Sequence, residues 1–208
     1  MSIFKTIFVI IGSYLIGSIV TSDIVTWFKK VDLRSQGSGN VGATNAFRVM
    51  GSFYGALVLV GDALKGIIAV LLGRWLNPFP NFDLAILAGF LVIIGHNWPV
   101  FSRFRGGKGI ATSLGVISIL TPWSITVAFT TWLVVFIVFG FVSLASILAA
   151  VSYPIAVYLF YQGDWYKFIF ALVISCLAIY RHKSNLGRLF HGQEHRILYQ
   201  NRGGAKEK

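Results

Sequence analysis

The sequence predicts an all-α integral membrane protein, a seven-transmembrane-helix bundle with one short span and cytosolic polar loops. Of its 208 residues, 56% are hydrophobic and 12% are charged, and the mean hydropathy is +0.74. The hydrophobic residues gather in long runs, and most basic residues lie between the runs or after the last one. A soluble domain of this size cannot bury so much apolar surface, whereas a bilayer accommodates it.

Seven apolar segments follow one another along the chain: residues 3–28, 51–73, 82–98, 109–121, 123–140, 142–161 and 165–181. No polar stretch between them is long enough for a separate soluble domain, so residues 1–208 are predicted to form a single membrane-embedded domain. The first segment has Lys5 near its start but lacks an evident small-residue cleavage site, which indicates an uncleaved span.

The fourth segment, 109–121, is shorter than the ~17–25 residues of an ordinary span. Three interpretations compete: a short span, a re-entrant half-helix and an interfacial helix. Basic clusters follow the first and third segments and form the C-terminal tail. With seven crossings and an external N-terminus, all three clusters face the cytoplasm, as the positive-inside rule requires. The charge pattern therefore favours seven crossings of the cytoplasmic membrane, with the polar loops on the cytoplasmic side.

The formal net charge of +11 has two interpretations. In a soluble protein it would indicate a nucleic-acid partner, but cytoplasmic loops of membrane proteins collect Lys and Arg anyway, so no nucleic acid is expected. The single cysteine, Cys176, has no partner for an intramolecular disulfide. His182, His191 and His195 lack a recognised metal-ligand spacing, so no metal is predicted and no cofactor is expected.

The first of three polar islands runs from Arg34 to Arg48 (RSQGSGNVGATNAFR). Its glycines let the backbone approach a ligand, and exposed amides beside Ser, Asn and Arg side chains can bind an anion. Gly37, Gly39 and Gly42 spell GxGxxG, but a dinucleotide site also needs a preceding strand, and here a membrane helix precedes the loop. A flexible loop between spans is the alternative interpretation.

The second island runs from Gly95 to Thr112 (GHNWPVFSRFRGGKGIAT). A glycine loop that contains Lys108 and opens onto a helix N-terminus attracts a phosphate through backbone amides and the helix dipole. Gly109 stands where a Walker motif requires Ser or Thr, so an NTPase is not expected. His96 also suits a histidine at a helix end that is bonded to backbone.

The third island follows the last apolar segment, from Arg181 to Glu194 (RHKSNLGRLFHGQE). His182 and Asn185 can share a helical face, which suits a hydrogen-bonding pair at a site and equally a helix cap. Inside the second segment, Asp62 and Lys65 have the same spacing. They are predicted to form a structural ion pair, which offsets the cost of burying either charge alone.

Together these stretches resemble the acyl-phosphate-dependent glycerol-3-phosphate acyltransferase family, bacterial integral membrane enzymes of phospholipid synthesis. The matching stretches are GSGNVGATNAFRVMG, DALKG, GHNWPVFSRFRGGKGIAT, VSLASI and RHKSNLGRLFHGQE, in this order over nearly the whole chain. The departures are minor: Leu186 stands where the family has Ile, and Ser184 and Gly187 occupy variable positions. The His and Asp four residues apart on which thioester-dependent acyltransferases usually rely do not occur in the sequence.

The resemblance implies transfer of an acyl chain from acyl phosphate to the 1-hydroxyl of sn-glycerol 3-phosphate, giving lysophosphatidic acid and phosphate by direct attack without an acyl-enzyme. The implied partners are these two substrates, the membrane lipids and the enzyme that makes acyl phosphate. The implied catalytic residues are Asn185, as an oxyanion donor, and His182, as a base whose proton a substrate phosphate can accept instead. The implied substrate-binding residues are Ser38, Asn40, Thr44, Asn45, Arg48, His96, Lys108, Ser143, Ser146, Arg188 and Glu194.

A transporter and a non-catalytic lipid-binding scaffold are the competing classes. A transporter predicts broken helices in corresponding halves and polar groups near the midplane, whereas the polar islands here are placed at the cytosolic face. A scaffold does not need three glycine-rich polar islands. The sequence therefore favours an enzyme.

Overall fold

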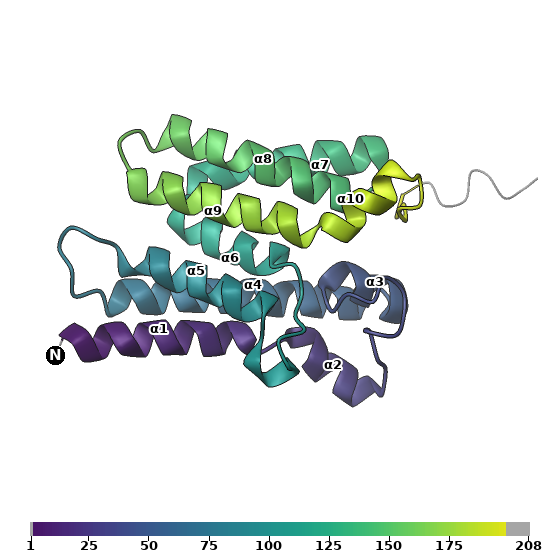
Figure 1. The fold of residues 1–208 in the computed structure, drawn as a ribbon, viewed down its shortest axis with the longest axis horizontal. Coiled ribbons are helices and arrows are strands. Elements are labelled where there is room, and N and C mark those ends of the chain that lie inside the picture. Colours follow the sequence, from purple (N-terminus) through teal and green to yellow (C-terminus); the bar gives the residue numbers. More distant parts are fainter. Residues whose placement is uncertain (1, 199–208) are drawn as a thin grey trace, which may run out of the picture. The chain divides into compact units, whose positions relative to one another are not determined.

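The computed structural model describes residues 2–198, and all regular secondary structure in this part of the chain is helical. The all-α prediction is therefore confirmed. The chain forms two compact units, unit 1 up to Pro122 and unit 2 from Trp123 onward. Helices α1 to α6, coloured purple to teal, belong to unit 1, and α7 to α10 form unit 2 (Figure 1). The single membrane domain stays a prediction.

The helices have the following bounds. Unit 1 contains α1 (Ser2–Ser18), α2 (Thr21–Lys29), α3 (Ala43–Met50), α4 (Ser52–Trp75), α5 (Leu84–Asn97), the 3-10 helix η1 (Val100–Ser102) and α6 (Ile110–Leu120). The helices that follow are α7 (Pro122–Phe139), α8 (Val142–Phe160), α9 (Trp165–Arg181) and α10 (Lys183–Phe190).

Five stretches of the described chain are long and apolar enough to cross a membrane: Ser2–Lys29, Ser52–Trp75, Leu84–Ser102, Pro122–Phe139 and Val142–Phe160. They make the chain a multi-pass membrane protein. The two remaining predicted spans correspond to α6, of 11 residues, and α9, of 17 residues. Seven crossings therefore stay a prediction.

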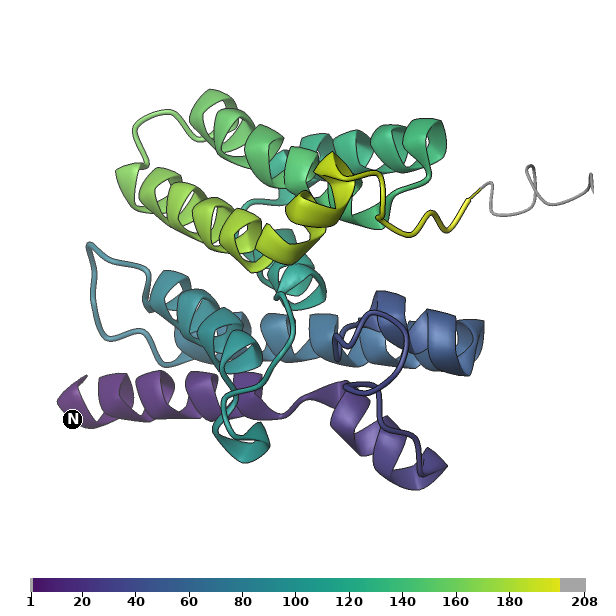
Figure 2. The ribbon, with the colours of Figure 1, turned by 45° about the vertical axis from the view of Figure 1, so that its right-hand side comes forward.

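The first apolar segment, predicted as one span over 3–28, is interrupted. α1 ends at Ser18 and α2 begins at Thr21, with Val20 in an extended conformation between them. Figure 2 shows the two helices as separate coils joined by a short link. Among the described residues no side chain caps the start of α2, but the carboxylate of Asp23 lies in its first turn, where a negative charge is favoured by the helix dipole. The break leaves carbonyl groups at the end of α1 without helical partners.

Small residues bring α6 close to α4 inside unit 1. A Cβ atom on Gly115 of α6 would overlap the Ala63 carbonyl, and one on Gly66 of α4 would overlap the Thr112 carbonyl. Small residues at helix crossings are the usual means of close packing in membranes. A helix of 11 residues is roughly 16 Å long, about half the hydrocarbon thickness, so protein contact along α4 favours its burial.

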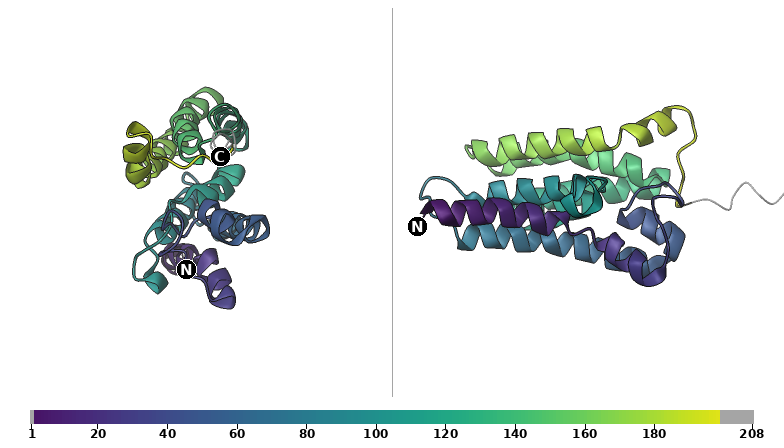
Figure 3. Two further views of the ribbon diagram at one scale, coloured as in Figure 1. Left: turned by 90° about the vertical axis from the view of Figure 1, so that its right-hand side faces the viewer. Right: turned by 60° about the horizontal axis from the view of Figure 1, so that its bottom comes forward.

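In unit 2, α8 and α9 lie side by side and α10 contacts both (Figure 3). α10 begins directly after α9, with His182 at the joint between the two helices. This joint turns the chain at the end of the last apolar helix and places the third polar island beside the start of α8.

Candidate active site

Two polar loops of unit 1 are tied together by one acidic side chain, Asp23 of α2. Its carboxylate accepts two hydrogen bonds from the Arg34 guanidinium, at 2.8 and 3.0 Å, and one from the Ser102 hydroxyl at 2.5 Å. Arg34 also donates to the Arg105 carbonyl at 3.1 Å. The hydrogen bond to Asp23 raises the pKa of the Arg34 guanidinium above its ordinary value. The first and second polar islands therefore meet in the fold, joined by the Arg34–Asp23 ion pair.

Asn45 of α3 holds the first loop in shape. Its amide nitrogen donates to the carbonyls of Leu33 and Gln36 at 3.1 and 3.0 Å, and its amide oxygen accepts from the backbone of Ser38 at 2.8 Å. The residue is 1% exposed, and both amide hydrogens are used within the loop. Asn45 therefore positions the loop, and its contact with substrate stays a prediction.

Glycine is required where this loop closes on Asn45. Gly37 has a φ of 61°, in the left-handed region, and a Cβ atom there would overlap the Asn45 amide oxygen. A side chain at this position would thus be strained and would displace the amide that orders the loop. Gly37 is the first glycine of the GxGxxG sequence, and here it forms part of a turn.

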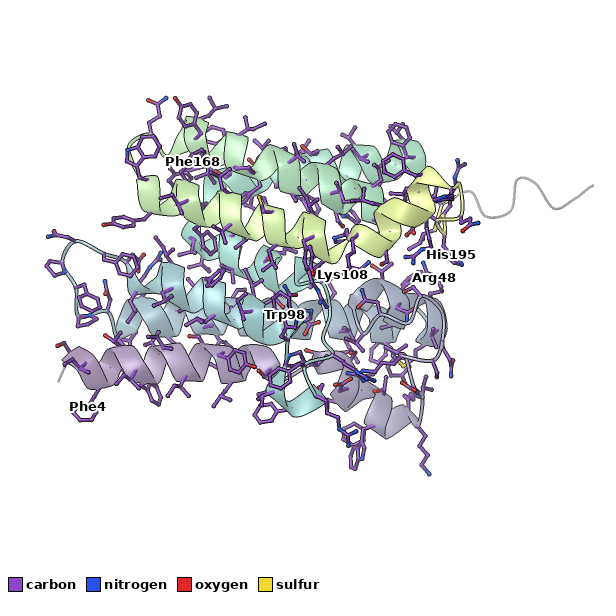
Figure 4. All side chains as sticks on the ribbon, viewed as in Figure 1. Phe4, Arg48, Trp98, Lys108, Phe168 and His195 are labelled. Atoms are coloured by element: carbon purple, nitrogen blue, oxygen red, sulfur yellow. The ribbon has the colours of Figure 1, made fainter. Side chains whose placement is uncertain are left out.

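The expected phosphate ligands of unit 1 lie on this loop, on α3 and on the loop before α6. Figure 4 shows Arg48 on α3 and Lys108 just ahead of α6. Both side chains are half-buried, and Arg48 lies 3.4 Å from the Asn45 amide oxygen. Thr44 lies one turn before Arg48 on α3, so the two share a helical face. The remaining expected polar ligands of the first loop are Ser38, which is exposed, and Asn40, which is half-buried.

The backbone of the second loop folds tightly around the end of α5. The Gly107 amide donates to the His96 carbonyl at 3.2 Å, and a Cβ atom on Gly106 would overlap that carbonyl. Gly109 has a φ of 82° and directly precedes α6. The two glycines next to Lys108 thus allow a close backbone path that ends at a helix N-terminus, a common environment for anion binding.

The predicted ion pair of α4 is present, and it has additional partners. Lys65 Nζ and Asp62 Oδ1 are 2.9 Å apart, and Asp62 Oδ1 also accepts from the Thr21 hydroxyl at 2.9 Å. His96, expected as a substrate ligand, is 2% exposed, and its Nδ1 lies 2.9 Å from Lys65 Nζ. The structure therefore places His96 against the ion pair, and contact between His96 and a substrate stays a prediction.

Glu194 gathers three other expected site residues in unit 2. Its carboxylate accepts from Asn185 Nδ2 at 2.7 Å, from the Ser143 hydroxyl at 3.0 Å and from Arg188 Nε at 2.7 Å. Burial raises the pKa of the Glu194 carboxyl, but the hydrogen bonds from Asn185, Arg188 and Ser143 outweigh burial and hold the pKa below its ordinary value. A carboxylate saturated by donors and repelled by phosphate suits the positioning of its neighbours better than direct contact with substrate.

His182 has a defined tautomer at the joint between α9 and α10. Its Nδ1 lies 2.8 Å from the Ala178 carbonyl, and a carbonyl can only accept, so Nδ1 carries the ring proton. In the neutral ring Nε2 is then the basic nitrogen. Ser146, the other residue expected from α8, donates to the Val142 carbonyl at 2.8 Å and accepts from Trp132 Nε1 at 3.3 Å, so it does not join the Glu194 cluster.

The structure adds Asp23, Thr21 and Ser102 to the residues expected from the sequence. Asp23 lies within the first apolar segment, and an acidic residue inside such a segment signals a specific partner. That signal was available in the sequence, but the partner of Asp23 was not. Thr21 and Ser102 carry no comparable signal, because single hydroxyls are common in membrane helices and loops.

A family model described as glycerol-3-phosphate acyltransferase matches residues 7–192. The chain is 45% identical to the glycerol-3-phosphate acyltransferase of Desulforamulus reducens, over 92% of this chain and 95% of the relative. It is 43% identical to that of Aquifex aeolicus, over 93% of this chain and 100% of the relative.

Two solved structures are similar as well. One is the crystal structure of PlsY, an integral membrane glycerol 3-phosphate acyltransferase, in its glycerol 3-phosphate form, with 40% identity and a TM-score of 0.87 over 92% of this chain and 95% of that chain. The other is PlsY in its lysophosphatidic acid form, with 39% identity and a TM-score of 0.84 over 92% of this chain and 94% of that chain.

Proposed function

Because this chain belongs to the glycerol-3-phosphate acyltransferase family, we propose that it transfers an acyl chain from acyl phosphate to the 1-hydroxyl of sn-glycerol 3-phosphate. The products are lysophosphatidic acid and phosphate. The names of its relatives and the two forms of PlsY support the acceptor and the lipid product. The observation that carries the proposal is the junction in unit 1 of two glycine-rich loops, one leading to Arg48 and the other to Lys108.

The proposed donor follows from the chemistry of the polar loops and from the sequence. A thioester donor is usually handled by a His and an Asp four residues apart, which the sequence lacks. An acyl phosphate brings its own phosphate, and loops with Arg48 and Lys108 suit two phosphate-bearing substrates. An acyl phosphate is also already activated, so the enzyme mainly has to position the substrates and stabilise the developing oxyanion.

We propose direct attack without an acyl-enzyme. The 1-hydroxyl oxygen attacks the acyl carbonyl, the bond between the carbonyl carbon and the phosphate oxygen breaks, and the phosphate leaves with the electron pair. The hydroxyl proton passes to His182 Nε2 or to a substrate phosphate. Asn185, held by Glu194, donates from its amide to the oxyanion that forms on the carbonyl oxygen.

In this proposal Arg48 and Lys108 bind the substrate phosphates. The polar ligands that complete the binding site are Ser38, Asn40, Thr44, His96, Ser143, Ser146 and Arg188. Asn45 and Glu194 hold the first loop and Asn185, respectively. Arg188 is charge-paired with Glu194 at 2.7 Å, so its contribution to phosphate binding is weaker than that of Arg48 and Lys108.

We further propose seven crossings of the cytoplasmic membrane, with the three polar islands facing the cytoplasm. The close packing of α6 on α4 supports a short crossing, because its backbone is sheltered by protein. Reporters fused at Gly37, Gly107 or the C-terminus should then be cytoplasmic, and reporters near Asn77 or Gln162 external. An external C-terminus would replace the short crossing with a re-entrant α6.

One assay tests the reaction itself. Purified protein is incubated with a long-chain acyl phosphate, and phosphate release is followed with and without glycerol 3-phosphate. Release should depend on glycerol 3-phosphate and match the lysophosphatidic acid formed. Acyl-coenzyme A at the same concentration should give no product, and robust turnover of the thioester would contradict the proposed donor.

A further inference from the structure

Lys65 fills the break between α1 and α2 from the middle of α4. Its ammonium lies 3.1 Å from the Gly17 carbonyl and 2.9 Å from the Ile19 carbonyl, in addition to its ion pair with Asp62. Carbonyls at the end of a helix have no helical donor and need another partner. Lys65, 6% exposed, supplies that partner, so the break is fixed by a buried cation.

The same ammonium fixes the ring of His96. Lys65 Nζ lies 2.9 Å from His96 Nδ1, and the same ring nitrogen lies 3.6 Å from Asp62 Oδ1, so the ion pair holds the Nδ1 edge of the ring. The Nε2 edge of the ring faces the second loop, because a Cβ atom on Gly107 would overlap Nε2. The imidazole is therefore enclosed between Lys65 on one side and the Gly106–Gly107 backbone on the other.

Stability alone does not account for this ion pair. The Asp62 side chain is 1% exposed, and its Oδ2 atom has no hydrogen-bond partner among the described residues. A buried pair with an unsatisfied oxygen costs desolvation, and apolar residues of similar volume often give equal or greater stability. The contacts that apolar residues cannot reproduce are those of Lys65 with the Gly17 and Ile19 carbonyls and with His96.

We propose that Lys65 is a positioning residue for the phosphate-binding loop around Lys108, acting through His96. Lys65 sets the orientation of the imidazole, and the imidazole packs against Gly107. The position of the Gly107 backbone in turn sets the backbone position of the next residue, Lys108. Lys65 itself touches no substrate. The inference rests on the proposed function, since it concerns the loop that binds substrate phosphate there.

The test removes both charges at once, because a single charge left in the interior can prevent folding. Asp62→Asn/Lys65→Met should raise the Michaelis constant for a phosphate substrate about tenfold or more, with a much smaller change in turnover. The matched control is Asp164→Asn/Lys167→Met, which removes an ion pair of the same spacing, 2.8 Å apart, at the start of α9. The control should leave both kinetic constants unchanged.

A coupling measurement separates positioning from general destabilisation. Gly107→Ala displaces the imidazole from the loop side and should raise the same Michaelis constant. When Gly107→Ala is combined with Asp62→Asn/Lys65→Met, the Michaelis constant should rise by less than about twofold beyond that of Asp62→Asn/Lys65→Met, because both changes act on the His96 ring. Full additivity would overturn the inference. If the double variant does not fold, Lys65→Arg takes its place, since a planar guanidinium cannot reproduce the contacts of an ammonium.

A second readout keeps this inference separate from the reaction. Inorganic phosphate should raise the melting temperature of the wild-type protein, and Asp62→Asn/Lys65→Met should need about tenfold more phosphate for the same rise. A wild-type protein without acyltransferase activity would refute the proposed function, and the phosphate titration would still decide the role of Lys65. An unchanged titration and an unchanged Michaelis constant in the double variant would overturn the role of Lys65 alone.

Discussion

Asp62 and Glu194 each gather polar groups around one carboxylate, and the surroundings of the two carboxylates differ. Asp62 lies inside α4, and one of its oxygens receives a lysine and a hydroxyl while the other has no partner among the described residues. Glu194 lies after α10, and donors from Asn185, Arg188 and Ser143 occupy both of its oxygens. Their side chains are 1% and 8% exposed.

The two carboxylates therefore depend on their hydrogen-bond donors in different ways. At Glu194 the charge is shared among three donors, so each donor is held by the carboxylate and the loss of one leaves two. At Asp62 the charge depends on one cation that serves several acceptors, so the loss of that cation exposes all of them. We therefore expect severe structural effects around Asp62 and mainly catalytic effects around Glu194.

The largest expected effect follows from breaking the pair at Asp62. Lys65→Met leaves a buried carboxylate and two helix-end carbonyls without their donor, and removal of one partner of a buried pair typically costs about 3–5 kcal/mol. Thermal unfolding of the detergent-purified variant should show this loss. Asp62→Asn/Lys65→Met should recover the part of the loss that comes from the unpaired carboxylate, but not the part that comes from the two carbonyls. If Lys65→Met is as stable as the wild type, Asp62 does not depend on Lys65, and the expected difference between Asp62 and Glu194 is wrong.

The next effect tests the catalytic side of the comparison. Asn185→Ala should lower turnover by about 10²–10³, with little change in either Michaelis constant, because an oxyanion donor acts only during the reaction. The alternative is a structural amide, whose loss costs about 1 kcal/mol of local stability, as at a helix cap. Steady-state kinetics and thermal unfolding separate the two. A destabilised variant with normal turnover per folded molecule would remove Asn185 from the active site.

A smaller effect is expected at Lys108, which contributes charge in the ground state and the transition state alike. Lys108→Ala should raise the Michaelis constant for a phosphate substrate about 10- to 100-fold, the range of a hydrogen bond to a charged group. The same measurement on Arg103→Ala is the control, because Arg103 is an exposed cation of the same loop. Equal effects at both positions would indicate general charge attraction instead of a specific phosphate contact.

The sequence predicted the helical membrane class and the Asp62–Lys65 contact, and it named the residues of the Glu194 cluster as site residues without predicting their contacts with one another. These predictions rest on composition, on i,i+3 spacing and on resemblance to family motifs. Composition and spacing can be read from the sequence without knowing which helices pack together, and the motifs come from the family. The interruption of the first apolar segment after Ser18 was missed, because no proline marks it and the carbonyl partner lies on another helix. The contact between His96 and Lys65 was missed for the same reason, since it joins α4 to α5.

The role of each expected site residue depends on the direction of its side chain. Asn45 and Glu194 were expected to bind substrate, which stays a prediction, and their hydrogen bonds connect them to Leu33, Gln36 and the donors of the Glu194 cluster. A sequence motif shows that a polar residue is needed but not which way its side chain faces. That direction depends on tertiary packing.

The smallest expected effect concerns the pH dependence that Glu194 gives to unit 2. The pKa of its carboxyl is held below its ordinary value, which for an unfolded chain is about 4.3. Between the lowered pKa and the ordinary value, the unfolded chain binds more protons than the folded chain, so stability falls as pH falls. The contribution is fully present above the unfolded pKa and is lost as pH falls through the folded pKa.

Glu194→Gln removes this titration while nearly preserving the volume of the side chain. The melting temperature of the wild type should exceed that of Glu194→Gln by a few degrees at pH 6, given about 2–4 °C for each 1 kcal/mol in a chain of this size. The difference should shrink as the pH falls from the ordinary pKa through the lowered pKa of the folded state, because the wild-type carboxyl then becomes neutral as well. Asp32→Asn is the control and should show a smaller difference, since the Asp32 residue is exposed and its carboxylate accepts from the Arg34 backbone. If the difference in melting temperature between wild type and Glu194→Gln stays constant with pH, the charge of Glu194 does not contribute to it. Glu194 would then have a purely structural role, as Asp62 has.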